Sequence, residues 1–402
     1  MGKEEIATYA YENTEFYKEK WKDIMEEGNK WSWDELPIVS KKELVHAGIQ
    51  AVSAEYYAKF GRDDIITDYT SGSTGECMEV YTTHKEQIRA LLSLWLYRKK
   101  FYGIDSIARL CYFYTFRDCK GDEPYEYFKN SLGFSKGILE PENLQFIYDK
   151  IKEFQPVWLL LQPSVAMVLA RYMLEEGLET ITSVQYIELS GEMFTKEQKN
   201  FISVAFNAVV ASQYGCNEVG TIAYQCPYGK LHIMDQNVHV DIINQGMIKE
   251  DTDYGNIIVT GKNNKVMPFV KYNTGDIGKI CKEGCKCSHK GKVLDLFAAR
   301  QNDLVKINDE WVSADIFKRI FQAMEWSLDG RIYQYRVEQK EEKVFAVYLA
   351  TNMEKEVVQD CFCHYAADTG LSGSKFYFQF YDYILPDLQT GKLKFFINDI
   401  VQ

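Results

Sequence analysis

The sequence has 402 residues, of which 46 are Lys or Arg and 58 are Asp or Glu, so its formal net charge at pH 7 is -12. This length predicts two or three domains, and the apolar content of 46% is typical of a globular protein and argues against a disordered chain. The acidic balance argues against a dedicated nucleic-acid-binding protein, because such proteins usually present a basic face.

The first residues contain no apolar signal core, so we expect a cytoplasmic protein. The most apolar stretch, residues 157–170, is interrupted by Gln162, Pro163 and Ser164 and is too short to span a bilayer, which predicts no membrane partner. In the cytoplasm, the ten cysteines are expected to be free thiols or metal ligands rather than a disulfide framework.

Helical and strand-like patterns alternate over the first two hundred residues. An amphipathic helical pattern covers the first forty residues and ends at Leu36-Pro37. A second helical pattern, residues 83–100, begins with the capping-box pair Thr83 and Glu86 and has Ile88, Leu91, Leu92 and Trp95 on one face. The strand-like runs are 65–67, 110–113, 157–160, 186–189 and 208–211. This alternation predicts a layered α/β domain.

The pattern changes after about residue 222. Residues 232–243 and 255–260 favour antiparallel β structure, and the last hundred residues mix helices with short strands, as at 343–349 and 375–380. We therefore predict an α/β protein with a large N-terminal domain, 1–299, whose part at about 223–299 is a β-rich subdomain. A small, mobile α+β domain, 300–402, follows it.

The most specific local signal is residues 69–75, Tyr-Thr-Ser-Gly-Ser-Thr-Gly, between two short strand-like runs. Glycines let the backbone fold tightly so that N–H groups point at an anion, and hydroxyls add further donors. No Lys follows the last Gly, so the Walker pattern is absent. The segment predicts either a phosphate-binding loop or a polar turn.

Two further segments follow strand-like runs. Residues 212–218, Ser-Gln-Tyr-Gly-Cys-Asn-Glu, lie at the carboxyl end of an apolar run, where open α/β sheets bind ligands. Tyr214 could offer its ring to a base, and Glu218 an oxygen ligand to magnesium; the alternative is a strand-end turn with a solvated Glu. Asp276, after Thr274-Gly275, could accept ribose hydroxyls or form an Asx-type turn.

The order of these motifs resembles that of the adenylate-forming acyl- and aryl-CoA synthetase superfamily. An Arg-Gln-Asn-Asp segment at Arg300 and a Thr-Gly-Lys segment at Lys392 complete the series, and the resemblance covers nearly the whole chain. Three other segments resemble the phenylacetate-CoA ligase branch: the Leu-Pro-Ile-Val-Ser-Lys motif at 36–41, the Ser-Gly-Glu turn at 190–192, and Cys226 with Leu231, His232 and Ile233.

The resemblance implies a role for each motif. Glu218 would help to hold magnesium, Tyr214 would pack on adenine, and Asp276 would bind the ribose with Arg300 nearby. Lys392, on the mobile domain, would reach the substrate carboxylate and the phosphate, and Asn302 would occupy the hinge. The ATP phosphates would lie under Ser71, Gly72, Ser73, Thr74 and Gly75.

The implied activity is a ligase reaction. A carboxylate, expected to be aryl or arylacetic, attacks the α-phosphorus of ATP in line and releases pyrophosphate. A thiol, that of CoA, then displaces AMP from the acyl-adenylate. The carboxylate is already anionic at pH 7, so positioning and charge neutralisation are enough and no general base is required.

Four positions depart from the family's pattern. Asn217 stands where a hydroxyl residue is usual, Lys271 replaces an Arg, Glu76 follows the phosphate loop, and Asp309 replaces part of a glycine turn beside the pantetheine path. Asp309 motivates an alternative in which the acceptor is a carrier-protein phosphopantetheine or an amine. A further alternative is a nucleotide-binding protein on a decayed ligase scaffold. The acid, the acceptor and the oligomeric state, including a homodimer, stay open.

Cysteine and histidine residues gather in two segments. Cys281, Cys285, Cys287 and His289 follow one another closely, and Cys226 and His232 lie upstream. Thiolates and imidazoles at such spacings suit tetrahedral zinc, and the phenylacetate-CoA ligase branch is similar here. The preferred set for a structural zinc site is Cys226, His232, Cys285 and Cys287. Cys281 or His289 could replace one of them, and free cytosolic thiols are the alternative.

Overall fold

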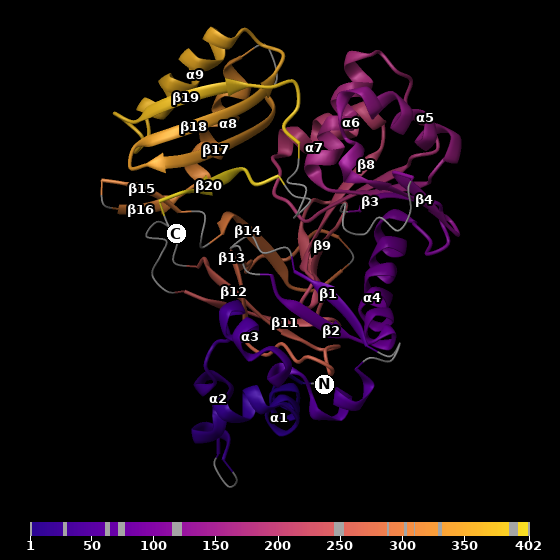
Figure 1. The fold of residues 1–402 in the computed structure, drawn as a ribbon, viewed down its shortest axis with the longest axis vertical. Helices are drawn as coiled ribbons and strands as arrows, with labels where there is room; N and C mark the ends of the chain where they lie inside the picture. The colour runs from indigo at the N-terminus through magenta and orange to yellow at the C-terminus, as the bar shows by residue number, and fades with distance from the viewer. Residues whose placement is uncertain are drawn as a thin grey trace. The chain divides into compact units, whose positions relative to one another are not determined.

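The computed structural model divides into two compact units (Figure 1). Unit 1 combines residues 1–106 with 212–297, and unit 2 combines 107–211 with 298–402. The structure describes residues 2–26, 30–60, 65–70, 77–114, 123–244, 253–287, 289–300, 304–308, 310–328, 332–385 and 393–400. Unit 2 therefore joins the C-terminal hundred residues to part of the expected N-terminal domain, and the predicted division at residue 300 stays a prediction.

Unit 1 contains N-terminal helices and most of an antiparallel sheet. The helices are α1 (Lys3–Asn13), α2 (Glu15–Met25), α3 (Lys41–Ala47) and α4 (His84–Tyr102). The sheet strands follow the order β11 (Val238–Ile243), β12 (Gly255–Gly261), β13 (Tyr272–Ile280), β14 (Val293–Arg300), β10 (Leu231–Ile233), β9 (Gly220–Gln225) and β8 (Val209–Cys216). The pairs β8–β9, β9–β10, β10–β14, β11–β12 and β12–β13 are antiparallel. The sequence predicts antiparallel structure for 232–243 and 255–260, which form β11 and β12 with part of β10.

The predicted first strand does not join this sheet. It forms β1 (Ile66–Tyr69), which pairs only with β2 (Glu79–Thr82) as an antiparallel hairpin in the described part of the chain. The expected capping box is present at the start of α4, where Thr83 and Glu86 exchange hydrogen bonds. The apolar face of α4 is exposed, however, with Ile88 at 65% and Leu92 at 59%, because the buried side is formed by Ser93, Leu94 and Arg98.

Unit 2 begins with a mostly parallel sheet. Its strands follow the order β7 (Tyr186–Ser190), β6 (Trp158–Leu161), β3 (Leu110–Tyr114), β5 (Ser131–Ser135) and β4 (Tyr125–Phe128), and only the β4–β5 pair in this series is antiparallel. The connecting helices are α5 (Leu144–Phe154), α6 (Pro163–Glu175) and α7 (Lys196–Phe206). Helices connect β5 to β6, β6 to β7 and β7 to β8, which is the predicted alternation, and a crossover helix is the usual connection between parallel strands.

The C-terminal part of unit 2 is the predicted α+β arrangement. Its sheet has the order β19 (Lys375–Phe380), β18 (Val344–Thr351), β17 (Ile332–Glu341) and β20 (Phe396–Asn398), and a separate hairpin joins β15 (Leu304–Ile307) to β16 (Glu310–Ser313). Helices α8 (Asp315–Ser327) and α9 (Lys355–Ala367) pack on each other and on this sheet (Figure 1). Their core contains the buried Phe317, Phe321 and Phe362. No helix in the described ranges is long and apolar enough to cross a membrane.

Candidate functional site

The β8–β9 hairpin carries two of the predicted nucleotide-binding residues. Tyr214 lies near the end of β8, and Glu218 lies in the turn before β9. Gly215 is required between them, because a Cβ at this position would lie 2.4 Å from the carbonyl oxygen of Gly220. The glycine that marks this motif in the sequence therefore has a structural cause, the close approach of two backbones.

Two phenol–carboxylate hydrogen bonds connect the hairpin to β13. The Tyr214 hydroxyl donates to Asp276 Oδ2 at 2.8 Å, and the Tyr272 hydroxyl donates to Glu218 Oε1 at 2.8 Å. Burial and the adjacent carboxylates raise the pKa of both phenols, so they remain protonated donors at neutral pH. Tyr214 and Glu218, predicted from one motif, and Asp276, predicted from another, thus belong to one cluster, which also contains Tyr272.

Asp276 is positioned by a tight turn. The Gly275 N–H donates to Asn273 Oδ1 at 2.9 Å, and Gly275 itself has a φ of 77°, a conformation that favours glycine. The Asp276 N–H donates to Thr274 Oγ1 at 3.2 Å. The Asx-type turn at this position is thus formed by Asn273 and not by Asp276, whose carboxylate accepts the Tyr214 hydroxyl instead.

The N-terminal segment supports the same strand. Val39 donates its N–H to the Lys271 carbonyl at 2.9 Å and accepts the Asn273 N–H at 2.8 Å, so the 36–41 motif runs beside the start of β13. The buried Lys271 ammonium donates to the carbonyls of Trp33 and Leu36 at 3.0 and 2.6 Å. Burial lowers the pKa of Lys271. Lys271, noted as a departure in the sequence, thus binds the N-terminal segment.

Asn217, a second departure, contacts the strand before the predicted phosphate loop. Its side-chain amide donates to the Tyr69 carbonyl at 3.0 Å, so the end of β1 is joined to the residue next to Glu218. The loop residues themselves, Ser71, Gly72, Ser73, Thr74 and Gly75, lie outside the described residues, as do Glu76, Asn302, Asp309 and Lys392. Arg300 ends β14, and its side chain also lies outside the described part.

The preferred cysteine–histidine set forms one cluster in unit 1. The potential ligand atoms of Cys226, His232, Cys285 and Cys287 all lie within 4.8 Å of one another. The Cys226 and Cys285 sulfurs are 3.6 Å apart, and Cys287 Sγ is 3.1 Å from His232 Nε2. Tetrahedral ligands at about 2.3 Å from zinc are roughly 3.8 Å apart, so these separations are near those of ligands that share one ion.

The surroundings of His232 favour a ligand role for Nε2. Its Nδ1 lies 3.3 Å from the Gly291 carbonyl, and a proton on Nδ1 would donate to that oxygen and leave the Nε2 lone pair facing Cys287. Burial lowers the pKa of His232, which favours the neutral imidazole. His289 instead contacts the Tyr97 hydroxyl at 2.9 Å, and neither it nor Cys281 is in the described cluster.

Comparisons with known proteins agree with this architecture. No protein-family model matches the sequence. The chain is 24% identical over 416 residues to Protein CapK of Staphylococcus aureus, a similarity that covers 99% of this chain and 88% of that protein. It is also similar to the structure of a 2-hydroxyisobutyryl-CoA ligase in its postadenylation state with R3-HIB-AMP, with a TM-score of 0.74, 13% identity and coverage of 99% of this chain and 88% of that one.

Two other solved structures are more distant. An anthranilate CoA ligase in complex with anthranoyl-AMP has a TM-score of 0.56 at 13% identity, over 83% of this chain and 66% of that one. The amide bond synthetase McbA from Marinactinospora thermotolerans has a TM-score of 0.54 at 15% identity, over 82% and 67%. The chain therefore has the fold of the adenylate-forming ligases, which confirms the predicted fold class.

The close approach at Gly215 leads to a stability prediction. We expect Gly215→Ala to lower the free energy of unfolding by about 1–3 kcal/mol, because the new methyl group overlaps the Gly220 carbonyl and forces the hairpin apart. Gly370→Ala is the matched control, since no atom lies within 4 Å of a Cβ there. Denaturant unfolding of both variants measures the difference, and equal midpoints would contradict the structural role assigned to Gly215.

Proposed function

We propose that this protein is an ATP-dependent, AMP-forming ligase that activates a carboxylic acid as its acyl-adenylate. The observation that carries the proposal is the cluster in which Tyr214 is paired with Asp276 and Tyr272 with Glu218. These residues come from two motifs whose order along the chain predicts this chemistry, and the chain has the fold of enzymes solved with acyl-adenylates.

In this proposal, each residue has a binding or positioning role. The Tyr214 ring packs on adenine, and the Asp276 carboxylate, held by its turn, accepts the ribose hydroxyls. The resemblance assigns Arg300 to nucleotide binding as well. The Glu218 carboxylate suits magnesium, which prefers oxygen ligands and would neutralise phosphate charge when bound. The hydroxyls and N–H groups of Ser71, Gly72, Ser73, Thr74 and Gly75 bind the phosphates, and Lys392 holds the substrate carboxylate against the α-phosphate.

The first half-reaction needs little acid–base chemistry. A carboxylate oxygen forms a bond to the α-phosphorus as the bond to the bridging oxygen of pyrophosphate breaks, so charge is redistributed and no proton is removed. In the second half-reaction, a thiolate sulfur attacks the acyl carbon and AMP leaves with the oxygen that the acid supplied. The residues contribute mainly by alignment and by neutralising charge.

The acid and the acceptor follow from the resemblance. We propose an aryl or arylacetic acid and the thiol of CoA; the anthranilate CoA ligase among the similar structures supports both choices. A carrier-protein phosphopantetheine or an amine is the second candidate acceptor, motivated by Asp309 and by the similarity to an amide bond synthetase. Glu218 and Asp276 are both present, and each is hydrogen-bonded to a tyrosine, which argues against a decayed ligase scaffold. A cytoplasmic location and a homodimer stay predictions.

The cysteine–histidine cluster is proposed as a structural zinc site. Three sulfurs and one imidazole nitrogen would close a tetrahedron and leave no position for substrate. Cys226 directly follows β9, His232 lies in β10, and Cys285 and Cys287 lie in the segment after β13. Because the cluster joins segments about fifty to sixty residues apart, a bound ion would stabilise this part of unit 1.

Acid-dependent ATP–pyrophosphate exchange tests the ligase function. We expect exchange with at least one member of a panel of aryl and arylacetic acids. Lys392→Ala should lower it by about 100-fold or more, since loss of a group that neutralises transition-state charge has this magnitude. Lys394→Ala removes the same charge two residues away and should change exchange by less than about threefold. Absence of exchange with every acid by the folded wild-type protein would contradict the proposal.

Metal analysis tests the zinc site. We expect one zinc per chain by elemental analysis of protein prepared in zinc-replete medium, and we expect Cys285→Ser to lose most of it, because a hydroxyl is a much weaker zinc ligand than a thiolate. Cys281→Ser should retain the metal, since Cys281 lies outside the cluster. Zinc-free protein with all cluster thiols open to a thiol reagent would contradict the assignment.

A further inference from the structure

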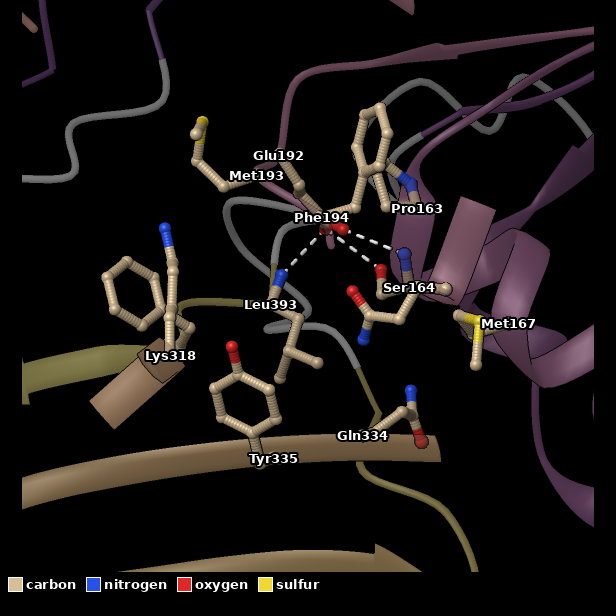
Figure 2. Close-up of a pocket in the computed structure, with 12 residues that line it drawn as sticks. Pro163, Ser164, Met167, Glu192, Met193, Phe194, Lys318, Gln334, Tyr335 and Leu393 are labelled. Carbon is tan, nitrogen blue, oxygen red and sulfur yellow. Dashed lines mark hydrogen bonds between the residues drawn. The ribbon is translucent and has the colours of Figure 1, made fainter. Parts of the chain in front are cut away.

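A buried carboxylate in unit 2 accepts three hydrogen bonds from two distant parts of the chain. Glu192 Oε2 accepts the Ser164 N–H at 2.8 Å, and Glu192 Oε1 accepts the Ser164 hydroxyl at 2.9 Å and the Leu393 N–H at 2.7 Å (Figure 2). We call Glu192, Ser164 and Leu393 the clasp. Burial raises the pKa of Glu192, while each of the three donors favours its charged form.

The local structure explains why Glu192 points at Ser164. Gly191, directly after β7, has a φ of 85°, so the chain turns sharply before Glu192. Ser164 is the second residue of α6, and the N-cap residue of that helix, Gln162, makes no side-chain capping bond. The Glu192 carboxylate therefore satisfies an N–H at the positive end of the α6 dipole, where a negative charge is favoured.

The third donor belongs to the segment that contains Lys392. The Leu393 nitrogen is bonded covalently to Lys392, so the hydrogen bond to this N–H holds the first described residue after the lysine. Downstream, Phe395 accepts the Val337 N–H at 2.8 Å, and β20 pairs with β17. The clasp residues line a pocket together with other residues of α6, the turn after β7, α8 and β17 (Figure 2).

The upstream side of this segment is held separately. Gln334, on β17, exchanges two hydrogen bonds with the backbone of Ile384, at 3.0 and 2.9 Å. Arg171, on α6, donates to the Asp382 carbonyl, and its guanidinium lies 4.7 Å from the centre of the Tyr383 ring. The described residues on both sides of the segment are thus held by hydrogen bonds, and Glu192 provides the side-chain acceptor for the Leu393 N–H.

We propose that Glu192 is a positioning residue for adenylation, which acts through the Leu393 N–H on the peptide that carries Lys392. The inference rests on the proposed function, in which Lys392 holds the acid against the α-phosphate. A purely structural cap of α6 would affect folding and both half-reactions alike. A positioning residue for Lys392 affects the half-reaction that uses the lysine.

The test compares the two half-reactions in Glu192→Gln. With the acid that gives the fastest exchange in the wild type, ATP–pyrophosphate exchange should fall about tenfold or more, since a hydrogen bond to a charged group has roughly this worth. Thioester formation from the synthetic acyl-adenylate and CoA should change by less than about threefold. Glu179→Gln is the control, because Glu179 pairs with Lys152 at the surface and should change neither rate.

A second variant removes the donor. Leu393→Pro lacks the N–H, so adding Glu192→Gln to this variant should have little further effect on ATP–pyrophosphate exchange. A tenfold further loss would show that Glu192 acts by another route and would overturn the proposal. Hydrogen exchange provides a readout that needs no activity: the peptide that contains Leu393 should lose protection in Glu192→Gln and keep it in Glu179→Gln.

The outcomes separate this proposal from the ligase function. If the wild type is active in ATP–pyrophosphate exchange, three results would overturn the role of Glu192 but not the ligase function. They are no selective loss of adenylation in Glu192→Gln, an equal fall in both half-reactions, or unchanged protection at Leu393. Absence of exchange in the wild type with every acid would overturn the ligase function and this role with it. A selective loss of adenylation together with lost protection at Leu393 would support the proposal.

Discussion

The two phenol–carboxylate hydrogen bonds between the β8–β9 hairpin and β13 are the constraint on which the candidate site depends. Each places a carboxylate, Asp276 or Glu218, against a tyrosine hydroxyl at 2.8 Å. Loss of either phenol would remove one of the hydrogen bonds that fix the position of its carboxylate partner. The close backbone approach at Gly215 and the turn at Gly275 both serve to bring these four side chains together.

The N-terminal part of the chain fixes the position of β13, which carries Tyr272 and Asp276. The buried Tyr17 hydroxyl donates to the Pro268 carbonyl and accepts the Val270 N–H, each at 3.0 Å, so α2 holds the chain just before β13. Lys271 and Val39 hold the next residues. A reaction that relies on alignment rather than on an acid or base requires such rigid support, since small displacements of positioning groups slow it strongly.

Sequence reasoning found the cysteine–histidine cluster and the order of the nucleotide motifs, because both depend on residue type and spacing along the chain. It did not find Tyr272 as a site residue, nor the contacts of Lys271 and Asn217, because their partners depend on strand register and on loops that meet from distant positions. Tyr272 lies in the segment Tyr-Asn-Thr-Gly-Asp that ends at Asp276, so its place four residues before Asp276 could have indicated a site residue. Periodicity identified α4 but could not indicate which of its faces is buried, since Ser93 and Arg98 are buried while Ile88 is exposed.

The proposed activity requires the carboxylate of an acid to attack the α-phosphorus of ATP. The most direct test supplies the best acid with heavy oxygen in its carboxylate, together with ATP, magnesium and CoA, and determines the mass of the AMP formed. Adenylation of the acid should give AMP that carries one labelled oxygen atom, since the oxygen that bonds to phosphorus leaves with AMP. Unlabelled AMP, or label found in inorganic phosphate with ADP as the product, would contradict it.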